Sequence, residues 1–226
     1  SFLRGYLYKT RHILPPVELP RIKKADLEAF QFKAGIKPGE RIIGMAARLA
    51  TEKGVEYLVE AMPQILKVHP EARVLFVGQY QNVFGEEAYA SKLAPLIEKL
   101  GSHWTFLGIL PPCEFAAFLQ SAEVSVLPSI NSTESFGLVQ VESMISGTPV
   151  VASNLPGVRQ PVTMTGMGEI VPIKDAGALA RAIISILNYP QRYRGNPDTV
   201  AQQFSPDVTA QQYEVIFQEL QKVKRP

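Results

Sequence analysis

The sequence predicts an α/β fold, a Rossmann-like doubly wound parallel sheet of about six strands with helices on both faces. The first observation behind this prediction is that short β-rich apolar runs alternate along the chain with segments of helical periodicity. The second is size and composition, since 226 residues with 46% hydrophobic content can bury one ordinary core. Strands separated by helices form parallel units with right-handed crossovers, so the ligand crevice is expected at the carboxyl ends of the strands.

The predicted elements follow one another from residue 41 onward. The predicted strands are short apolar runs, namely RIIGMA (41–46), ARVLFVG (72–78), WTFLG (104–108), VSVLP (124–128), PVVAS (149–153) and EIVPI (169–173). The predicted helices cover 55–68, 86–100, 111–120, a segment from about Gly137, 176–187, and a tail from about Asp207 to Lys222. TMTGMG (163–168) is predicted to be a flexible loop.

Three regions are expected along the chain. Residues 1–20 contain Pro15, Pro16 and Pro20 and predict an extended linker. Residues 21–205 form the predicted Rossmann-like domain, and residues 206–226 form an amphipathic C-terminal helix. Because the chain lacks an initiator methionine, we expect that it was cut from a longer protein.

Composition excludes several classes of protein. No apolar run approaches the ~20 residues that cross a bilayer, and no signal peptide is recognisable, so we expect a soluble protein. The single Cys113 excludes an internal disulfide framework, offers no metal cluster and suits the cytoplasm. A net charge of only +2 does not predict a nucleic-acid surface.

Two acids stand in the otherwise apolar stretch ESFGLVQVESMISGTPVVASN (134–154). In a helix from Gly137 to Ser146, Leu138, Val141 and Ile145 would form the buried stripe, with Glu142 at its edge. A carboxylate there needs a hydrogen-bonding partner unless it leans into solvent.

The start of this helix predicts an anion site. The free N–H groups of Gly137, Leu138 and Val139 would face an anion, and Glu134 stands in the loop just before them. Two acids on either side of such a site suit the hydroxyls of a ligand that carries a phosphate, such as a nucleotide sugar. Taken alone, Glu134 is equally explained as a solvated loop acid near the helix dipole.

A second candidate anion site follows the first strand. Arg48 and Lys53, in RLATEKG (48–54), offer donors that suit phosphate oxygens. The alternative is a pair of surface cations, one of them neutralised by Glu52. The turn lacks the G-x-G-x-x-G fingerprint, which counts against NAD or FAD.

Together these segments resemble a known family. RIIGMAARLATEKGVEYLVEA and VLPSINSTESFGLVQVESMISGTPVVAS resemble the C-terminal, donor-binding domain of retaining GT-B glycosyltransferases, group 1, with their Glu-x7-Glu signature. The order of the motifs agrees from about Leu14 to the C-terminus.

The resemblance implies a role for each site residue. Arg48 and Lys53 would hold the donor diphosphate, and Glu134 would bind the transferred sugar; these three are the implied catalytic residues. The implied donor-binding residues are Phe136, Gly137, Leu138, Val139, Glu142 (on the ribose), Ile109 and Leu110 (at the base), and Gly78. Ala47 departs from the family's usual glycine before Arg48, which would crowd the phosphate loop.

The resemblance also implies the reaction and its partners. A hexosyl group would pass with retention from a UDP-, GDP- or ADP-sugar to a sugar or lipid acceptor, in the cytoplasm, with no metal or other cofactor and no nucleic acid. The acceptor-binding half is absent, residues 1–13 would be its remnant, and the last helix would cross back to it. This chain would therefore bind the donor without efficient transfer. The resemblance also leaves open that the intact enzyme associates peripherally with a membrane.

Two other classes of function stay open. One is a sugar phosphorylase or a nucleotide-sugar epimerase on a related scaffold, although no lysine lies between Lys99 and Lys174 to form a pyridoxal Schiff base. The other is a non-catalytic nucleotide-sugar-binding module.

Overall fold

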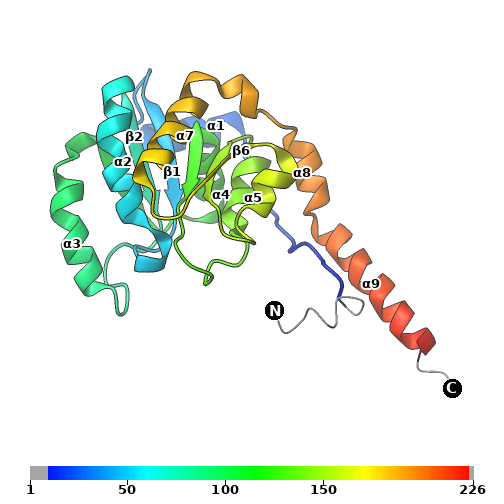
Figure 1. Cartoon of the computed structure of the whole chain (residues 1–226). Coiled ribbons are helices and arrows are strands. Elements are labelled where there is room, and N and C mark those ends of the chain that lie inside the picture. Colours follow the sequence, from blue (N-terminus) through cyan, green and yellow to red (C-terminus); the bar gives the residue numbers. More distant parts are fainter. Residues whose placement is uncertain (1–9, 224–226) are drawn as a thin grey trace.

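The computed structural model describes residues 10–223 and contains one six-stranded sheet in the order β3-β2-β1-β4-β5-β6, with every pair parallel (Figure 1). The strands are β1 (Arg41–Ala46), β2 (Ala72–Val77), β3 (Trp104–Gly108), β4 (Val124–Leu127), β5 (Val150–Ser153) and β6 (Gly168–Val171). The order reverses between β1 and β4, which places a ligand crevice at the carboxyl ends of these two neighbours. The predicted fold class is confirmed.

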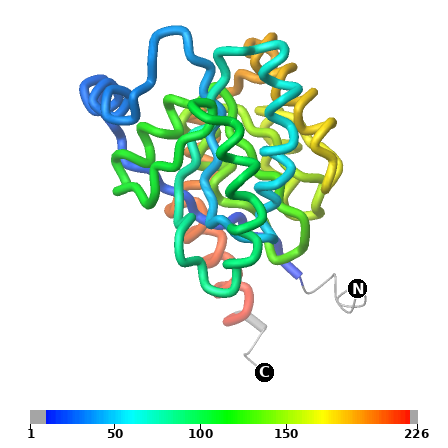
Figure 2. The backbone as a smooth tube through the Cα atoms, turned by 90° about the vertical axis from the view of Figure 1, so that its left-hand side faces the viewer, coloured from blue at the N-terminus to red at the C-terminus, as the bar shows by residue number. Residues whose placement is uncertain are grey.

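Helices cover both faces of the sheet (Figures 1 and 2). The α-helices are α1 (Lys24–Lys33), α2 (Val55–Val68), α3 (Glu87–Glu98), α4 (Pro112–Ser121), α5 (Leu138–Ile145), α6 (Gln160–Thr165), α7 (Ala176–Asn188), α8 (Pro197–Gln203) and α9 (Pro206–Val223). The 3-10 turns are η2 (Thr51–Lys53), η3 (Gly101–His103) and η4 (Pro190–Tyr193). The buried apolar side chains show which helices pack on which face of the sheet. One face is covered by α2, α3 and α7, and the other by α1, α4, α5, α6 and α8.

The central strand β1 contributes side chains to the hydrophobic cores on both faces of the sheet. Its side chains alternate between the faces, as strand geometry requires. Ile43 and Met45 pack in the core with α2 and α7, whereas Ile42 packs with α4. Gly44 faces α4 as well, where a Cβ atom would lie 3.0 Å from the Phe118 ring. A strand buried on both faces explains why RIIGMA is an almost unbroken apolar run.

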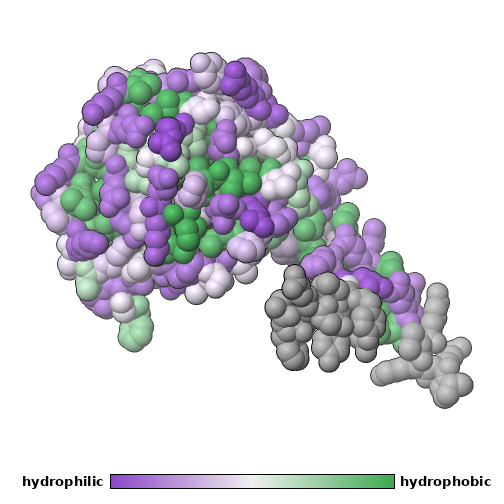
Figure 3. All heavy atoms as spheres, viewed as in Figure 1, coloured by the Kyte–Doolittle hydropathy of each residue, from purple (hydrophilic) through white to green (hydrophobic). Residues whose placement is uncertain are grey.

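The last helix projects from the body beside the first described residues (Figures 1 and 2). The Thr209 hydroxyl donates to the Leu14 carbonyl at 3.1 Å, and the Val17 N–H donates to the Phe204 carbonyl at 2.8 Å. Beyond Thr209 the helix is mostly exposed, and Figure 3 shows apolar side chains among polar ones on it. Its exposed apolar side chains are Tyr213, Val215, Phe217 and Leu220.

Several sequence predictions need correction. The helices α1, α6 and α8 were not predicted, and the loop prediction for 163–168 is wrong because α6 includes Thr163 to Thr165. This short helix stays in place because Pro161 and Val162 are buried and Gly166, at φ +68°, ends it. Residues 10–20 of the predicted linker form no helix or strand, and its first part, residues 1–9, lies outside the described residues.

Candidate functional site

A cleft of about 490 Å³ opens at the carboxyl ends of β1, β2 and β3. It is lined by Ala46, Ala47, Arg48, Val77, Gly78, Gln79, Ile109, Leu110, Phe115, Val139 and Glu142. Six of the residues predicted for the donor site are therefore brought together there, namely Arg48, Gly78, Ile109, Leu110, Val139 and Glu142. The remaining predicted residues, Lys53, Glu134, Phe136, Gly137 and Leu138, do not line this cleft.

The backbone makes up much of the cleft wall. The Ala47 N–H donates to the Val77 carbonyl at 2.9 Å, and the Gly78 N–H donates to the Gly108 carbonyl at 2.8 Å. Gly78 has φ +125°, and a Cβ atom built on it would lie 2.1 Å from the Ala47 carbonyl oxygen. Only glycine fits there, because both the conformation and the close approach exclude a side chain. The loops after three neighbouring strands therefore join into one surface.

The loop after β1 carries the predicted cations and leads through η2 into α2. The Arg48 Nη2 atom donates to the Glu52 carboxylate at 3.0 Å, and the Arg48 side chain is 60% exposed. Gly54, at φ +64°, separates η2 from α2, and a Cβ atom on it would lie 2.2 Å from the Pro128 carbonyl oxygen. This contact presses the cationic loop against the loop that follows β4. One part of the alternative expected for this loop, the pairing of a cation with Glu52, is present at Arg48, but Lys53 is not a surface cation.

Lys53 and Glu134 meet across this boundary. The Lys53 Nζ atom donates to the Glu134 carboxylate at 2.7 Å, and their side chains are only 21% and 15% exposed. The Ser129 hydroxyl makes a longer contact of 3.4 Å with the same carboxylate oxygen. Residues 81 positions apart in the sequence are thus joined at the carboxyl ends of adjacent strands. Each predicted cation therefore has a carboxylate partner.

The predicted buried stripe of α5 is partly wrong. Val141 is fully buried as expected, but Leu138 is 46% exposed and Ile145 is only half-buried. Gln140, Ser143 and Met144 complete the buried face. Leu138 is exposed because it is the first residue of the helix. Before it, Gly137 is the N-cap at φ +76°, so the helix begins with N–H groups that have no intrahelical acceptor.

Glu142 differs from the other site acids because its carboxylate has no hydrogen-bond or ion-pair partner within residues 10–221. Its side chain is half-buried and faces the cleft, and burial raises the pKa of the Glu142 carboxyl above its ordinary value. The partner predicted for this acid is absent from that part of the chain. A half-buried charge without a partner is unfavourable, and a ligand hydroxyl in the cleft would satisfy it.

Sequence reasoning missed Gln140. Its side chain is fully buried, and the Nε2 amide donates to the Phe136 carbonyl at 3.0 Å and to the Val158 carbonyl at 2.8 Å. Its Oε1 atom has no hydrogen-bond partner among the residues that the structure describes. This amide connects the loop that carries Glu134 with the loop after β5. The available signal was a glutamine between apolar residues in a helix that otherwise looks built for burial.

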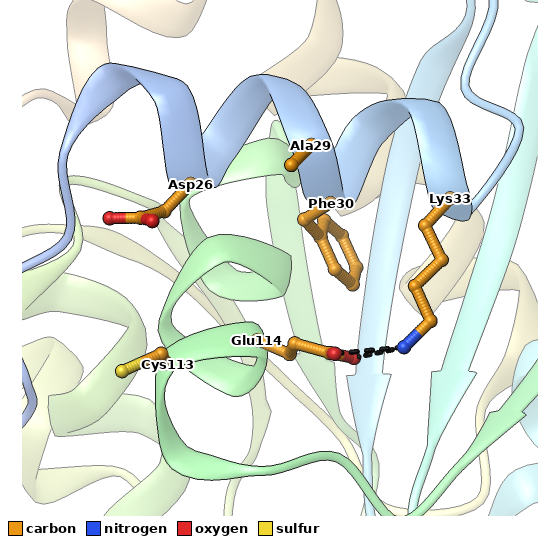
Figure 4. A pocket seen from close by; sticks show the side chains of 6 residues that line it. All are labelled: Asp26, Ala29, Phe30, Lys33, Cys113 and Glu114. Atoms are coloured by element: carbon orange, nitrogen blue, oxygen red, sulfur yellow. Dashed lines mark hydrogen bonds and ion pairs between the residues drawn. The ribbon is translucent and has the colours of Figure 1, made fainter.

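A smaller hollow of about 200 Å³ between α1 and α4 carries none of the predicted residues (Figure 4). Its Lys33 pairs with Glu114 at 2.8 Å, and its Asp26 carboxylate accepts the Lys23 N–H at 2.8 Å. Cys113, at the start of α4, is exposed here. With its charged groups already bonded within the fold, this hollow offers no better site than the cleft.

The fold defines the chain as a Rossmann-like domain with a cleft at the carboxyl ends of its central strands. The sequence identifies the family as well, because residues 26–200 match the model of glycosyl transferases group 1. The chain belongs to this family, and its fold is the one that GT-B glycosyltransferases share.

Known proteins resemble the chain over most of its length. A phosphatidyl-myo-inositol mannosyltransferase of Mycobacterium leprae is 34% identical over 66% of this chain and 37% of its own length. Sucrose-phosphate synthase from Thermosynechococcus elongatus is 29% identical, with a TM-score of 0.79 over 99% of this chain and 56% of its own. Anabaena HepE in complex with UDP is 24% identical, with a TM-score of 0.74 over 87% and 54%. The chain therefore spans about half or less of the length of these proteins.

Proposed function

We propose that this chain is the donor-binding half of a retaining glycosyltransferase. The intact enzyme transfers a hexosyl group from a nucleoside-diphosphate sugar to an acceptor, and this half binds the nucleotide sugar without efficient transfer. Membership of the glycosyltransferase family supports the general reaction. The similarity to enzymes about twice as long supports an acceptor site outside the present residues.

The observation that carries the proposal is the unpaired carboxylate of Glu142 in a cleft that also contains Arg48. A ribose diol suits this acid, because two neighbouring hydroxyls can donate to one carboxylate. The base lies at Ile109 and Leu110, on the far side of the cleft from the diphosphate. The phosphates then face the backbone amides of Gly137, Leu138 and Val139. Phe136 and Gly78 lie in the two loops that border the bound donor.

In the free site, Glu134 and Lys53 bind each other. When the donor enters, Lys53 turns to the diphosphate and stabilises the charge on the leaving group, together with Arg48. Glu134 is then free to accept hydrogen bonds from the transferred sugar near its anomeric carbon. The exchange of one partner for another keeps both charges satisfied, which limits the free energy lost to desolvation.

We assign no metal and no other cofactor to the catalytic step, since two side-chain cations and backbone amides neutralise the leaving diphosphate in this scheme. The base is uracil, guanine or adenine, and the acceptor is a sugar or a lipid. We place the intact enzyme in the cytoplasm, where peripheral contact with a membrane would give it access to lipid acceptors. None of the helices within residues 10–223 combines the length and apolarity needed to cross a bilayer.

Calorimetric titration of the chain with UDP, GDP and ADP tests the proposal. One diphosphate should bind in the micromolar-to-millimolar range, and Lys53→Ala or Glu142→Ala should weaken it by about 1–3 kcal/mol, as for a lost charge-assisted hydrogen bond. Lys33→Ala is the matched control, because it removes an exposed lysine from the hollow between α1 and α4. Absence of binding to all three diphosphates would refute the proposal. Binding without donor hydrolysis or transfer by the full-length parent protein would favour the non-catalytic module.

A further inference from the structure

Both cations of the site carry a carboxylate partner, but the two partners differ in position. Glu134 belongs to the loop after β4 and has a role of its own in the proposed reaction. Glu52 lies on η2, four residues after Arg48, and does not line the cleft. Its contact with Arg48 is a single bond of 3.0 Å to one nitrogen of the guanidinium. The other donors of the Arg48 fork remain available to a ligand.

A hydrogen bond to the neighbouring loop fixes the backbone of Glu52, and its carboxylate bonds to Arg48. The Glu52 carbonyl accepts the Ile130 N–H at 3.0 Å, and the Glu52 side chain is only 20% exposed. This acid therefore lies next to Arg48 in the chain without ligand. A phosphate that reaches Arg48 must compete with the Glu52 carboxylate and meets its negative charge.

We infer that Glu52 discriminates between donor and product in the proposed reaction, and promotes release of the nucleoside diphosphate. This inference rests on the proposed function. The free diphosphate carries an additional negative charge on its terminal phosphate, whereas in the nucleotide sugar that oxygen is esterified. Repulsion by Glu52 therefore weakens the binding of the product more than the binding of the donor.

Removal of the charge by Glu52→Gln provides the test, because glutamine keeps the shape of the side chain. Calorimetry on the chain compares UDP with UDP-glucose, GDP with GDP-mannose, or ADP with ADP-glucose, according to which diphosphate the wild type binds. The variant should bind the free diphosphate about threefold to tenfold more tightly, as expected for removal of one screened charge, and the nucleotide sugar at most about twofold more tightly.

Two comparisons separate this role from others. Glu60→Gln, on the exposed side of α2, makes the same change in net charge away from the cleft and should leave both affinities unchanged. In an Arg48→Ala background, the tightening by Glu52→Gln should persist or increase, because the Glu52 charge then acts on the phosphate without its cation partner.

The opposite sign would identify a different role. If Glu52 instead holds Arg48 in position for the phosphate, Glu52→Gln weakens diphosphate binding, and the inference is overturned. Equal tightening of diphosphate and nucleotide sugar also overturns it, and so does an unchanged affinity. A wild-type chain that binds none of these ligands would overturn the proposed function itself, which is a separate outcome.

Discussion

The loop after β1 and the helix α5 after β4 both contribute to the cleft, yet their charges are treated in opposite ways. The loop after β1 holds Arg48 and Lys53, and each has a carboxylate within 3.0 Å. The helix after β4 holds Glu142, whose carboxylate is half-buried and lacks a partner in the described part of the chain. The first arrangement is electrostatically satisfied without a ligand, whereas the second is not. Substitutions on the two sides should therefore change folding stability with opposite signs.

The contact that joins the loops after β1 and β4 should show the largest effect. Gly54→Ala should reduce the free energy of unfolding by about 3 kcal/mol, because the new Cβ meets the Pro128 carbonyl oxygen and the φ of +64° disfavours alanine. Gly39→Ala is the matched control, since it has φ +85° with open space around the new Cβ, and should cost about 1 kcal/mol. Urea unfolding measures both. Equal losses would mean that the close approach to Pro128 does not fix the loops.

The pair between the loops should show the next largest effect. Glu134→Gln should destabilise the chain by about 1–2 kcal/mol, because it leaves the Lys53 charge largely buried without an anion. Glu114→Gln breaks a pair of similar length, 2.8 Å, whose Lys33 side chain is 66% exposed, and should cost below about 1 kcal/mol. Denaturant unfolding of the two variants compares them directly. A larger loss in Glu114→Gln would contradict the difference in burial.

The smallest effect on folding stability, with the opposite sign, is expected from substitution of Glu142. Because burial raises the pKa of Glu142 in the folded chain, its ionisation disfavours the folded state as pH rises from the ordinary glutamate value of about 4.3 through the raised folded value. Glu142→Gln should therefore be more stable than the wild type at pH 7, on the order of 1 kcal/mol, while it binds the diphosphate more weakly. Below pH 4 the two chains should be equally stable. A variant that is less stable at pH 7 would show that Glu142 has a stabilising role.

The sequence was sufficient for the sheet because β1 and the other strands are short apolar runs between periodic helices. The sequence pattern did not predict α1 and α6. The helix α1 buries only Phe30, and α6 is a short helix that contains a proline and ends at a glycine. In such elements tertiary contacts outweigh the local pattern. The Glu52 contact to Arg48 could be foreseen from spacing. The pairing of Lys53 with Glu134 could not, because it depends on which strands become neighbours.

For the candidate site, too, local sequence patterns predicted some features and missed those that depend on contacts between elements. Residues that act through their place in a motif, such as Arg48, Gly78 and Glu142, were brought to one cleft. The exposure of Leu138 was missed because helical periodicity does not report that the first residue of a helix is less covered than those inside it. The unpaired state of Glu142 was missed for a related reason. Whether a carboxylate has a partner depends on side chains from other elements, which no local pattern specifies.

The buried amide of Gln140 has a mechanical consequence. Because one side chain holds the carbonyls of Phe136 and Val158, it links the segments that follow β4 and β5. A bound molecule that displaces either segment must pull the other with it or break a hydrogen bond in a dry interior. Movement of the loop that carries Glu134 is therefore coupled to movement of the loop after β5.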